Sequence, residues 1–232
     1  MKKFILLLAT MGLSLPVFSQ VAPFLEKGKS GLGISAAAEQ GYTLKGCLGT
    51  IGGSYKGLVD VEVAYYSDQY DQEANGLLND QASSSGFVAN ATWWLARKQP
   101  TQNIEVNLGL VAGFQRFSFS DYTMRRTDNE VFDADGYSEG IFGVDTRIHF
   151  QLSKSWFLMP GYCVTYNIGQ ETNTLNGVET TDSSTGLSSK ASVSLFKRFN
   201  KGNVLSLTVS QGWDTYNTGN YYQLSVGYVL AL

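Results

Sequence analysis

The chain is poor in the residues on which most metal and hydrolytic sites are built. Its 232 residues include one His and two Cys, and only 16% of them are charged. A structural zinc site needs four His or Cys ligands, so that class of site is excluded. The formal net charge of −3 leaves no basic footprint for nucleic acid. We therefore expect no metal, no cofactor and no nucleic-acid partner.

Long apolar runs are missing beyond the N-terminus. Residues 1–19 combine Lys2 and Lys3 with the apolar run 4–9 and small residues before Gln20, which predicts a secretory signal peptide. From residue 20 onward, no stretch approaches the about 20 apolar residues of a membrane-spanning helix. This excludes a helical membrane protein but not a membrane β-barrel, whose strands are about ten residues long and alternate in polarity.

Aromatic residues and glycine are abundant, with 13 Tyr, 13 Phe, 4 Trp and 25 Gly. Residues 20–29 show no period and are predicted as a short periplasmic segment. From residue 30 to the end, polar and apolar residues alternate with a period of two, which indicates strands. The predicted strands cover residues 30–39, 42–55, 58–67, 85–97, 103–119, 137–152, 155–168, 186–199, 203–215 and 220–232.

The predicted connections alternate between tight turns and open loops. Tight turns are predicted at 56–57, 97–100, 153–154 and 200–202. Open loops are predicted at 68–84, 120–136 and 169–185, with shorter ones near 40–41 and 216–219. In an up-and-down barrel, all tight turns then lie at one end and all open loops at the other. Bacterial outer-membrane barrels have this plan, with short periplasmic turns and longer extracellular loops.

The two faces of each strand differ in size as well as polarity. In the last strand, Tyr222, Leu224 and Val226 alternate with Gln223 and smaller residues. A soluble sheet or sandwich with an apolar core would show the same alternation, and that alternative stays open. Bulky apolar residues suit a lipid-facing side, however, and small polar residues suit a crowded lumen. We therefore expect the apolar face to point outward.

Aromatic residues gather near the predicted strand ends. Amphipathic rings at the two membrane interfaces form the girdles of outer-membrane barrels. The residues that we predict for these girdles are Tyr65, Tyr66, Trp93, Trp94, Phe117, Phe119, Trp156, Phe157, Trp213, Tyr216, Tyr221 and Tyr222.

The C-terminal pattern carries a family resemblance. Tyr222-x-Leu224-x-Val226-x-Tyr228-x-Leu230-x-Leu232 looks like the terminal strand that outer-membrane assembly machinery reads, although such strands typically end in an aromatic residue. With the signal peptide and the segment 54–61, the mature chain resembles the small porin-like outer-membrane barrels of Gram-negative bacteria. The resemblance implies an all-β, antiparallel, up-and-down transmembrane β-barrel over residues 30–232. We expect ten strands, with eight as the alternative.

The resemblance also implies a location in the cell outer membrane. Its lipid and the barrel-assembly machinery are the expected partners, and we expect a monomer with both termini in the periplasm. We expect a non-enzymatic structural or surface-interaction protein. A narrow porin-like channel for small solutes and a lipid- or peptide-modifying enzyme remain as alternatives.

Charged residues divide between loops, turns and inward faces. The predicted open loops are acidic, with Asp68 and Glu171 among them, whereas the tight turns carry Lys and Arg. These acids either keep the loops solvated or bind divalent cations that bridge to anionic lipid. Asp133, Asp135 and Glu139 match part of a calcium loop, but Val131 stands where a ligand is needed, so we expect no calcium site.

Charged residues on the inward faces are predicted to form a structural network in the lumen, because buried charges must be paired. Its predicted members are Asp60, Glu62, Glu105, Asp145, Arg147, His149, Lys190 and Arg198.

An enzyme would need a partner for the single His. Outer-membrane proteases of the omptin type also have ten strands, and their chemistry needs an Asp–His pair near the extracellular rim. Asp145 lies four residues before His149 on one strand, which separates their α-carbons by about 13 Å. His149 also lies beside a tight turn, at the periplasmic end, although an acid on a neighbouring strand could still partner it. Cys47 and Cys163 fall on distant strands, so we expect two free thiols.

Overall fold

The computed structural model describes residues 28–41, 44–70, 78, 81–125, 131–199, 202–214 and 221–232. The predicted signal peptide and nearly all of the predicted N-terminal segment lie outside the described residues. In the described part of the chain, no helix is long and apolar enough to cross a membrane.

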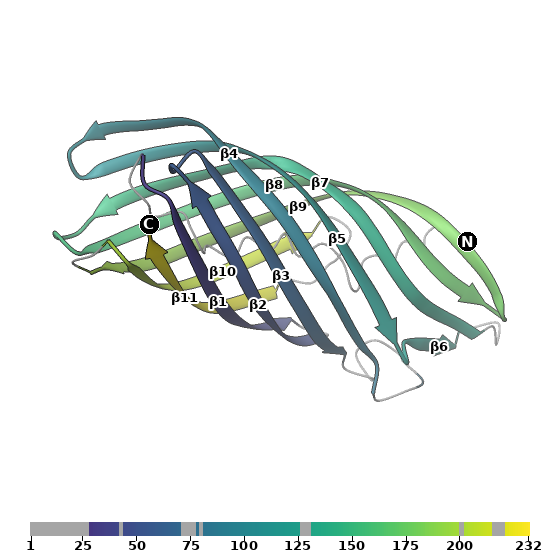
Figure 1. Cartoon of the computed structure of the whole chain (residues 1–232). Helices are drawn as coiled ribbons and strands as arrows, with labels where there is room; N and C mark the ends of the chain where they lie inside the picture. Colours follow the sequence, from purple (N-terminus) through teal and green to yellow (C-terminus); the bar gives the residue numbers. More distant parts are fainter. Residues whose placement is uncertain are drawn as a thin grey trace.

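The described residues form ten antiparallel strands in a closed ring, with one short additional strand, β6 (Figure 1). Each strand of the ring pairs with its neighbour in sequence. Pairing of β5 with β7 and of β1 with β11 completes the circle. The strands are β1 (Gly31–Gly41), β2 (Leu44–Tyr55), β3 (Val59–Tyr70), β4 (Ser83–Thr101), β5 (Ile104–Ser120), β6 (Thr123–Arg125), β7 (Val131–Gln151), β8 (Trp156–Leu175), β9 (Val178–Arg198), β10 (Val204–Asp214) and β11 (Tyr221–Ala231).

Ring closure confirms the prediction of ten strands and excludes eight. The glycine- and alanine-rich β1 pairs with β2 from Gly31 to Gln40 and with β11 along its whole length. It is therefore a full member of the ring rather than an edge. A closed ring leaves no unpaired strand edge within the membrane, as lipid requires. The same closure excludes the soluble sandwich.

The outer surface of the ring is apolar and its lumen is polar. Along β11, Leu224 and Val226 are each about half exposed, whereas Gln223 between them is buried. β10 repeats this pattern, with Leu205, Leu207 and Val209 outward and hydroxyl side chains inward. We call this continuous band of outward apolar side chains the apolar belt. A water-soluble protein hides such a surface, whereas a transmembrane barrel turns it toward lipid. The predicted orientation of the two faces is confirmed.

The turn end of the barrel contains the connections at 56–58, 102–103 and 152–155. Lys56 and Gly57 both have positive φ, as a tight type I′ hairpin requires, and the turn predicted there is confirmed. The turn predicted at 97–100 is wrong. β4 continues to Thr101, and its pairing with β5 shifts between Lys98 and Thr101. This irregularity accommodates Pro100, which cannot donate a ladder hydrogen bond.

The opposite end, which we call the loop end, differs more from the prediction. Residues 169–185, predicted as an open loop, continue β8 and β9 as a paired hairpin whose turn is Asn176-Gly177. We call residues 169–185 the hairpin extension. The loop predicted at 120–136 is partly wrong as well, because it contains β6 and the first residues of β7. Residues 40–41, predicted as a short loop, are the end of β1, and the loop predicted at 68–84 overlaps the end of β3 and the start of β4. The middle of that loop and the loop predicted at 216–219 lie outside the described residues.

The hairpin extension reaches beyond the apolar belt. The last outward apolar residue of β8 is Ile168, and beyond it the outward side chains are polar on both strands. β7 pairs with β8 along this stretch, and β6 pairs with the start of β7. In Figure 1, β9 runs well past the ends of β1 to β3. The outward residues are Gln170, Thr172, Thr174, Glu179, Thr181, Ser183 and Thr185.

Candidate functional site

The lumen holds its charged side chains in groups, the first of them between β3, β4 and β7. Arg147 donates two hydrogen bonds to Asp145 Oδ2, and its guanidinium lies 4.8 Å from the centre of the Trp94 ring. Trp94 Nε1 in turn donates to Asp60 Oδ2 at 2.8 Å. These four side chains are buried. The cation therefore has a carboxylate on one side and an aromatic face on the other, which compensates for its loss of water.

A second group lies nearer the turn end. Arg97 donates from Nε and Nη2 to Glu105 Oε1, at 2.9 and 2.7 Å, and from Nη1 to the carbonyl oxygen of Gly57. His149 stands opposite Glu105 in the pairing of β5 with β7. The sequence prediction missed Arg97 because it assigned residues 97–100 to a turn. Simple alternation past Trp94 would have placed Arg97 outward, because only the register shift between Trp94 and Ala96 turns it toward the lumen.

The third group follows the inner wall of the barrel from β9 to β1. Lys190 Nζ donates to Gln223 Oε1 at 2.8 Å, and Gln223 Nε2 donates to Glu39 Oε2 at 3.4 Å. All three side chains are buried. Lys190 was predicted to face inward, whereas Glu39 and Gln223 were not assigned to the network. The amide of Gln223 thus joins a cation and a carboxylate that do not touch directly.

The remaining predicted members lie on the same inner surface. Glu62 is buried on β3, within electrostatic range of Arg147 and Lys190. Arg198 lies 4.6 Å from the centre of the Phe157 ring near the turn end. The structure therefore distributes the eight predicted residues over several groups rather than one centre. This arrangement pairs opposite charges, and the interactions between side chains of different strands hold those strands together.

The predicted aromatic girdles are only half right. In each adjacent pair, one ring faces lipid and the other faces the lumen, because successive side chains of a strand alternate. Tyr65 is 61% exposed and Tyr66 is 1% exposed. Trp93, Trp156 and Tyr222 likewise point outward, and each has a buried aromatic neighbour. The buried rings are Tyr66, Trp94, Phe117, Phe157 and Tyr221.

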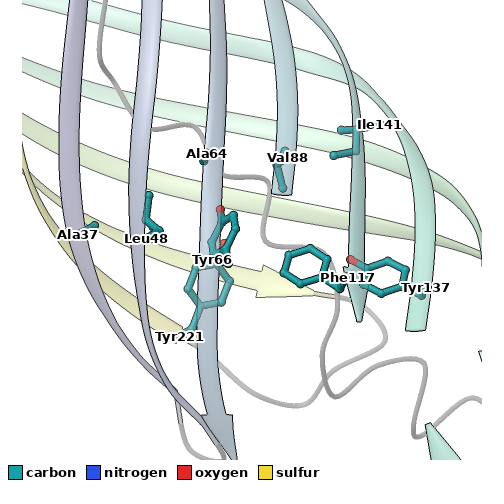
Figure 2. Packing of buried hydrophobic residues seen from close by; sticks show 9 residues of the cluster. All are labelled: Ala37, Leu48, Ala64, Tyr66, Val88, Phe117, Tyr137, Ile141 and Tyr221. Atoms are coloured by element: carbon teal, nitrogen blue, oxygen red, sulfur yellow. The ribbon is translucent and has the colours of Figure 1, made fainter. Parts of the chain in front are cut away.

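Several of these rings form an apolar cluster toward the loop end, which we call the upper cluster. Phe117 stacks on Tyr137 with ring centres 5.4 Å apart, and Tyr66 lies 5.5 Å from Phe117 (Figure 2). Below Tyr137, Gln115 donates to the Tyr137 hydroxyl and to Glu139. Its side chains come from β1, β2, β3, β4, β5, β7 and β11 and point toward one another in the lumen (Figure 2). The members are Ala37, Leu48, Ala64, Tyr66, Val88, Phe117, Tyr137, Ile141 and Tyr221.

The inner face of the hairpin extension carries a buried acid. Glu171 is 4% exposed, and burial raises its pKa to about 7, with the nearby Asp182 carboxylate acting in the same direction. Tyr122 lies close by, between β5 and β6, and burial together with Glu171 raises its pKa. The sequence prediction placed Glu171 and Asp68 in loops. Both lie instead on strands, with buried side chains.

The two cysteines are free, as predicted. Cys47 is exposed on β2, and Cys163 is buried on β8 beside Val111. Among the described residues, no three His, Cys, Asp or Glu side chains lie close enough together to hold a metal ion. Asp135 of the partial calcium motif accepts a hydrogen bond from Thr174, whereas Glu139 is bonded to Gln115 inside the lumen.

Comparison with known proteins places the fold. No protein-family model and no curated protein sequence matches the chain. Among solved structures, it is similar to the β domain of the Bordetella autotransporter BrkA, with a TM-score of 0.53 and 12% identity over 88% of this chain and 100% of that one. It is also similar to the translocator domain of the autotransporter NalP from Neisseria meningitidis, with a TM-score of 0.52 and 9% identity over 89% and 90% of the two chains.

At these identities the likeness shows the fold. The chain is a ten-stranded antiparallel barrel of the kind found in Gram-negative outer membranes. The closed ring, the apolar belt and these neighbours together confirm the predictions of an outer-membrane barrel fold and of its location.

Proposed function

We propose that this protein is a non-enzymatic, monomeric barrel that acts at the cell surface through its hairpin extension. The observation that carries the proposal is the change at Ile168. Beyond this residue, β8 and β9 stay fully paired, while their outward side chains change from apolar to hydroxyl, amide and carboxylate groups. A pre-ordered polar sheet edge above the membrane loses little conformational entropy on binding a partner.

The absence of enzymatic activity is part of this proposal, and the placement of Asp145 supports it. A catalytic His is usually oriented by a carboxylate. Asp145 Oδ2 accepts both hydrogen bonds from Arg147, which stands between Asp145 and His149 on the same strand. Asp145 is therefore the hydrogen-bond acceptor of Arg147 and does not orient His149.

Site-specific labelling and cross-linking test the surface role. In a Cys47→Ser background, Thr181→Cys should react with a membrane-impermeant maleimide on intact cells. Lys154→Cys, at the turn end, should react only after the outer membrane is opened. A photo-crosslinking residue at position 181 should then give a discrete adduct in living cells, whereas the same residue at position 154 should not. Labelling of position 154 alone, or equal adducts from both positions, would contradict the proposal.

A narrow channel is the second candidate, because one side of the lumen is lined by small hydroxyl groups. Thr208 donates to Ser194 at 2.8 Å, and further buried Ser and Thr side chains continue the line along β8, β9 and β10. Discrete conductance steps in planar bilayers, with an ion selectivity that changes in Glu62→Gln or Arg147→Gln, would favour this candidate. Negligible conductance would favour the surface role. The lining residues are Thr165, Ser188, Ser194, Ser206, Thr208 and Ser210.

A further inference from the structure

Two buried carboxylates converge near the loop end of the lumen. In the strand pairing, Glu39 of β1 stands opposite Gly46 of β2, and Gly46 stands opposite Asp68 of β3. Glu39 is 5% exposed and Asp68 is 3% exposed. A side chain at position 46 would separate the two acids. Because Gly46 has none, the Asp68 carboxylate lies over the backbone of β2, where a methyl group at position 46 would collide with its Oδ1 atom.

Three oxygen atoms at this place lack hydrogen-bond partners among the described residues: Glu39 Oε1, Asp68 Oδ1 and the hydroxyl of Tyr66. Tyr66 is 1% exposed, and its phenol lies within electrostatic range of both carboxylates. Buried polar atoms normally have a partner, because leaving one without a hydrogen bond forfeits the interactions that it had with water. Three such atoms gathered in one place indicate that a donor is missing from the site.

The balance of charge points to a cation as the missing donor. Lys190 is the buried ammonium group nearest to this place, and it interacts with Glu62 as well as with Glu39. Its Nζ atom bonds to Gln223 and not to either of the two converging acids. Glu62 also lies within range of Arg147, whereas Lys190 is the only described cation that acts on Glu39. The two converging carboxylates, Glu39 and Asp68, thus have a single described cation near them, and Glu62 competes for it. Buried carboxylates without full compensation attract a further positive charge.

The shape of the site favours an organic ammonium ion over a metal. Calcium takes six to eight oxygen ligands, and this place offers two carboxylates and a phenol. A primary ammonium group has three N–H donors, which matches the three unpaired oxygen atoms. The upper cluster begins at Tyr66 and continues to Phe117 and Tyr137, whose ring faces attract cations and accept an aliphatic chain.

We propose that Glu39, Asp68 and Tyr66 bind the ammonium group of a small aliphatic amine inside the barrel. Glu39 and Asp68 each lie two residues before the end of their strand, which places the site about 7 Å below the loop end. The amine enters from that side, with its ammonium group on the two carboxylates and its chain against the rings of the upper cluster. The site does not depend on the hairpin extension and goes beyond the proposed surface role.

An NMR titration of the ¹⁵N-labelled barrel in detergent micelles tests the site, with the backbone amide of Gly46 as reporter. Propylammonium chloride should shift this signal saturably. 1-Propanol, which has the same chain without the charge, should not, and this control corrects for partition into the micelle. Calcium chloride at equal ionic strength should act more weakly than the amine.

Three variants and a matched control locate the binding. Glu39→Gln and Asp68→Asn keep the shape of the side chain and should each weaken propylammonium binding at least about tenfold, because a hydrogen bond to a charged group is lost. Tyr66→Phe should weaken it about two- to tenfold. Asp121→Asn, an exposed acid at the same end with a left-handed backbone that Asn tolerates, should bind within about twofold of the unaltered protein.

Several results would overturn the proposal. They are a linear response to propylammonium, unchanged affinity in Glu39→Gln and Asp68→Asn, or tighter binding of calcium than of the amine. Heat-modifiable gel mobility should show that each variant is folded. Tyr66→Phe removes only one oxygen atom, so it tests the site even where a charge-removing variant fails to insert.

Discussion

The parts of β8 and β9 on either side of Ile168 share one backbone pattern and differ in their surroundings. On the belt side, outward positions hold Tyr162, Val164, Tyr166 and Ile168, each at least a third exposed. In the hairpin extension, the same alternation presents Thr, Ser, Gln and Glu instead. Pairing is continuous across this boundary. The comparison teaches that backbone geometry decides which side chains point outward, while the surrounding medium decides which residue types are tolerated there.

The inner faces of the two parts also differ. At the level of the belt, Arg147 is held by Asp145 and by the Trp94 ring. In the hairpin extension, Glu171 is buried beside Asp182 and Tyr122, and its pKa is raised. At the level of the belt, the buried guanidinium of Arg147 is therefore paired with a carboxylate, whereas the extension holds a buried acid whose pKa is raised.

Removal of Arg147 should have the largest effect. Arg147→Ala leaves the buried carboxylates of Asp145 and Asp60 without their common cation and should lower the free energy of unfolding by about 3–5 kcal/mol. Glu179→Ala, in the exposed part of the extension, should change it by less than about 0.5 kcal/mol. Urea unfolding in lipid vesicles, followed by tryptophan fluorescence, measures both. Equal effects of the two substitutions would contradict the distinction between the buried charge pair at the belt and the exposed surface of the extension.

A charge on the outer surface should come next. Leu207→Arg places a cation in the apolar belt and should cost about 2–4 kcal/mol of unfolding free energy. Thr181→Arg places the same side chain on the extension, where water solvates it, and should cost less than about 0.5 kcal/mol. The same unfolding measurement applies. A similar loss of stability in both variants would contradict the inference that the surroundings change from lipid to water at Ile168.

The stability of the hairpin extension should depend on pH through Glu171. Because its pKa in the folded chain is about 7, above the ordinary 4.5, the folded state holds the proton more tightly than the unfolded state. This contribution is complete below about pH 4.5 and is lost as pH rises through 7, with a total on the order of 1–3 kcal/mol.

Hydrogen exchange of the hairpin amides at several pH values measures this dependence. Glu171→Gln should remove it and make the extension more stable than the unaltered protein above pH 7. A pH dependence that persists in Glu171→Gln would assign it to another group.

The turn of the extension should give the smallest effect. Gly177 has a φ of 80°, which an L-residue adopts at a cost of about 1–2 kcal/mol. Gly177→Ala should therefore speed hydrogen exchange in the hairpin extension and leave the exchange of the belt amides unchanged. Faster exchange in both parts would show that the extension and the belt unfold together.

The adjacent aromatic pairs show where prediction from sequence stopped. Tyr65-Tyr66 and Trp93-Trp94 were assigned together to the girdles, although a strand must turn one of each pair inward. Applying the period of two to each pair would have separated them. It would not have shown that Tyr66 meets Phe117 and Tyr137, because contacts across the lumen depend on the curvature and closure of the ring.

The sequence of the hairpin extension contains a turn signal, but its polar composition was given more weight in the prediction. Asn-Gly is the dipeptide most typical of a tight hairpin turn, and Asn176-Gly177 marks the actual turn. The polar composition of residues 169–185 favoured a loop instead, because strands were recognised by their apolar face. Beyond the membrane, the outer face of a strand contacts water and does not have to be apolar.

The period of two and the size difference between the faces were sufficient to predict ten strands, the orientation of their faces and the inward placement of Arg147, Lys190 and acids such as Asp145. They did not find the buried acids Glu39, Asp68 and Glu171. The predicted properties are local, since each strand alternates regardless of its neighbours. The pairing of Arg147 with Trp94, the bridge from Lys190 through Gln223 and the meeting of Glu39 with Asp68 over Gly46 required the tertiary structure. They depend on register and on distances across a closed ring, which bring together residues far apart along the chain.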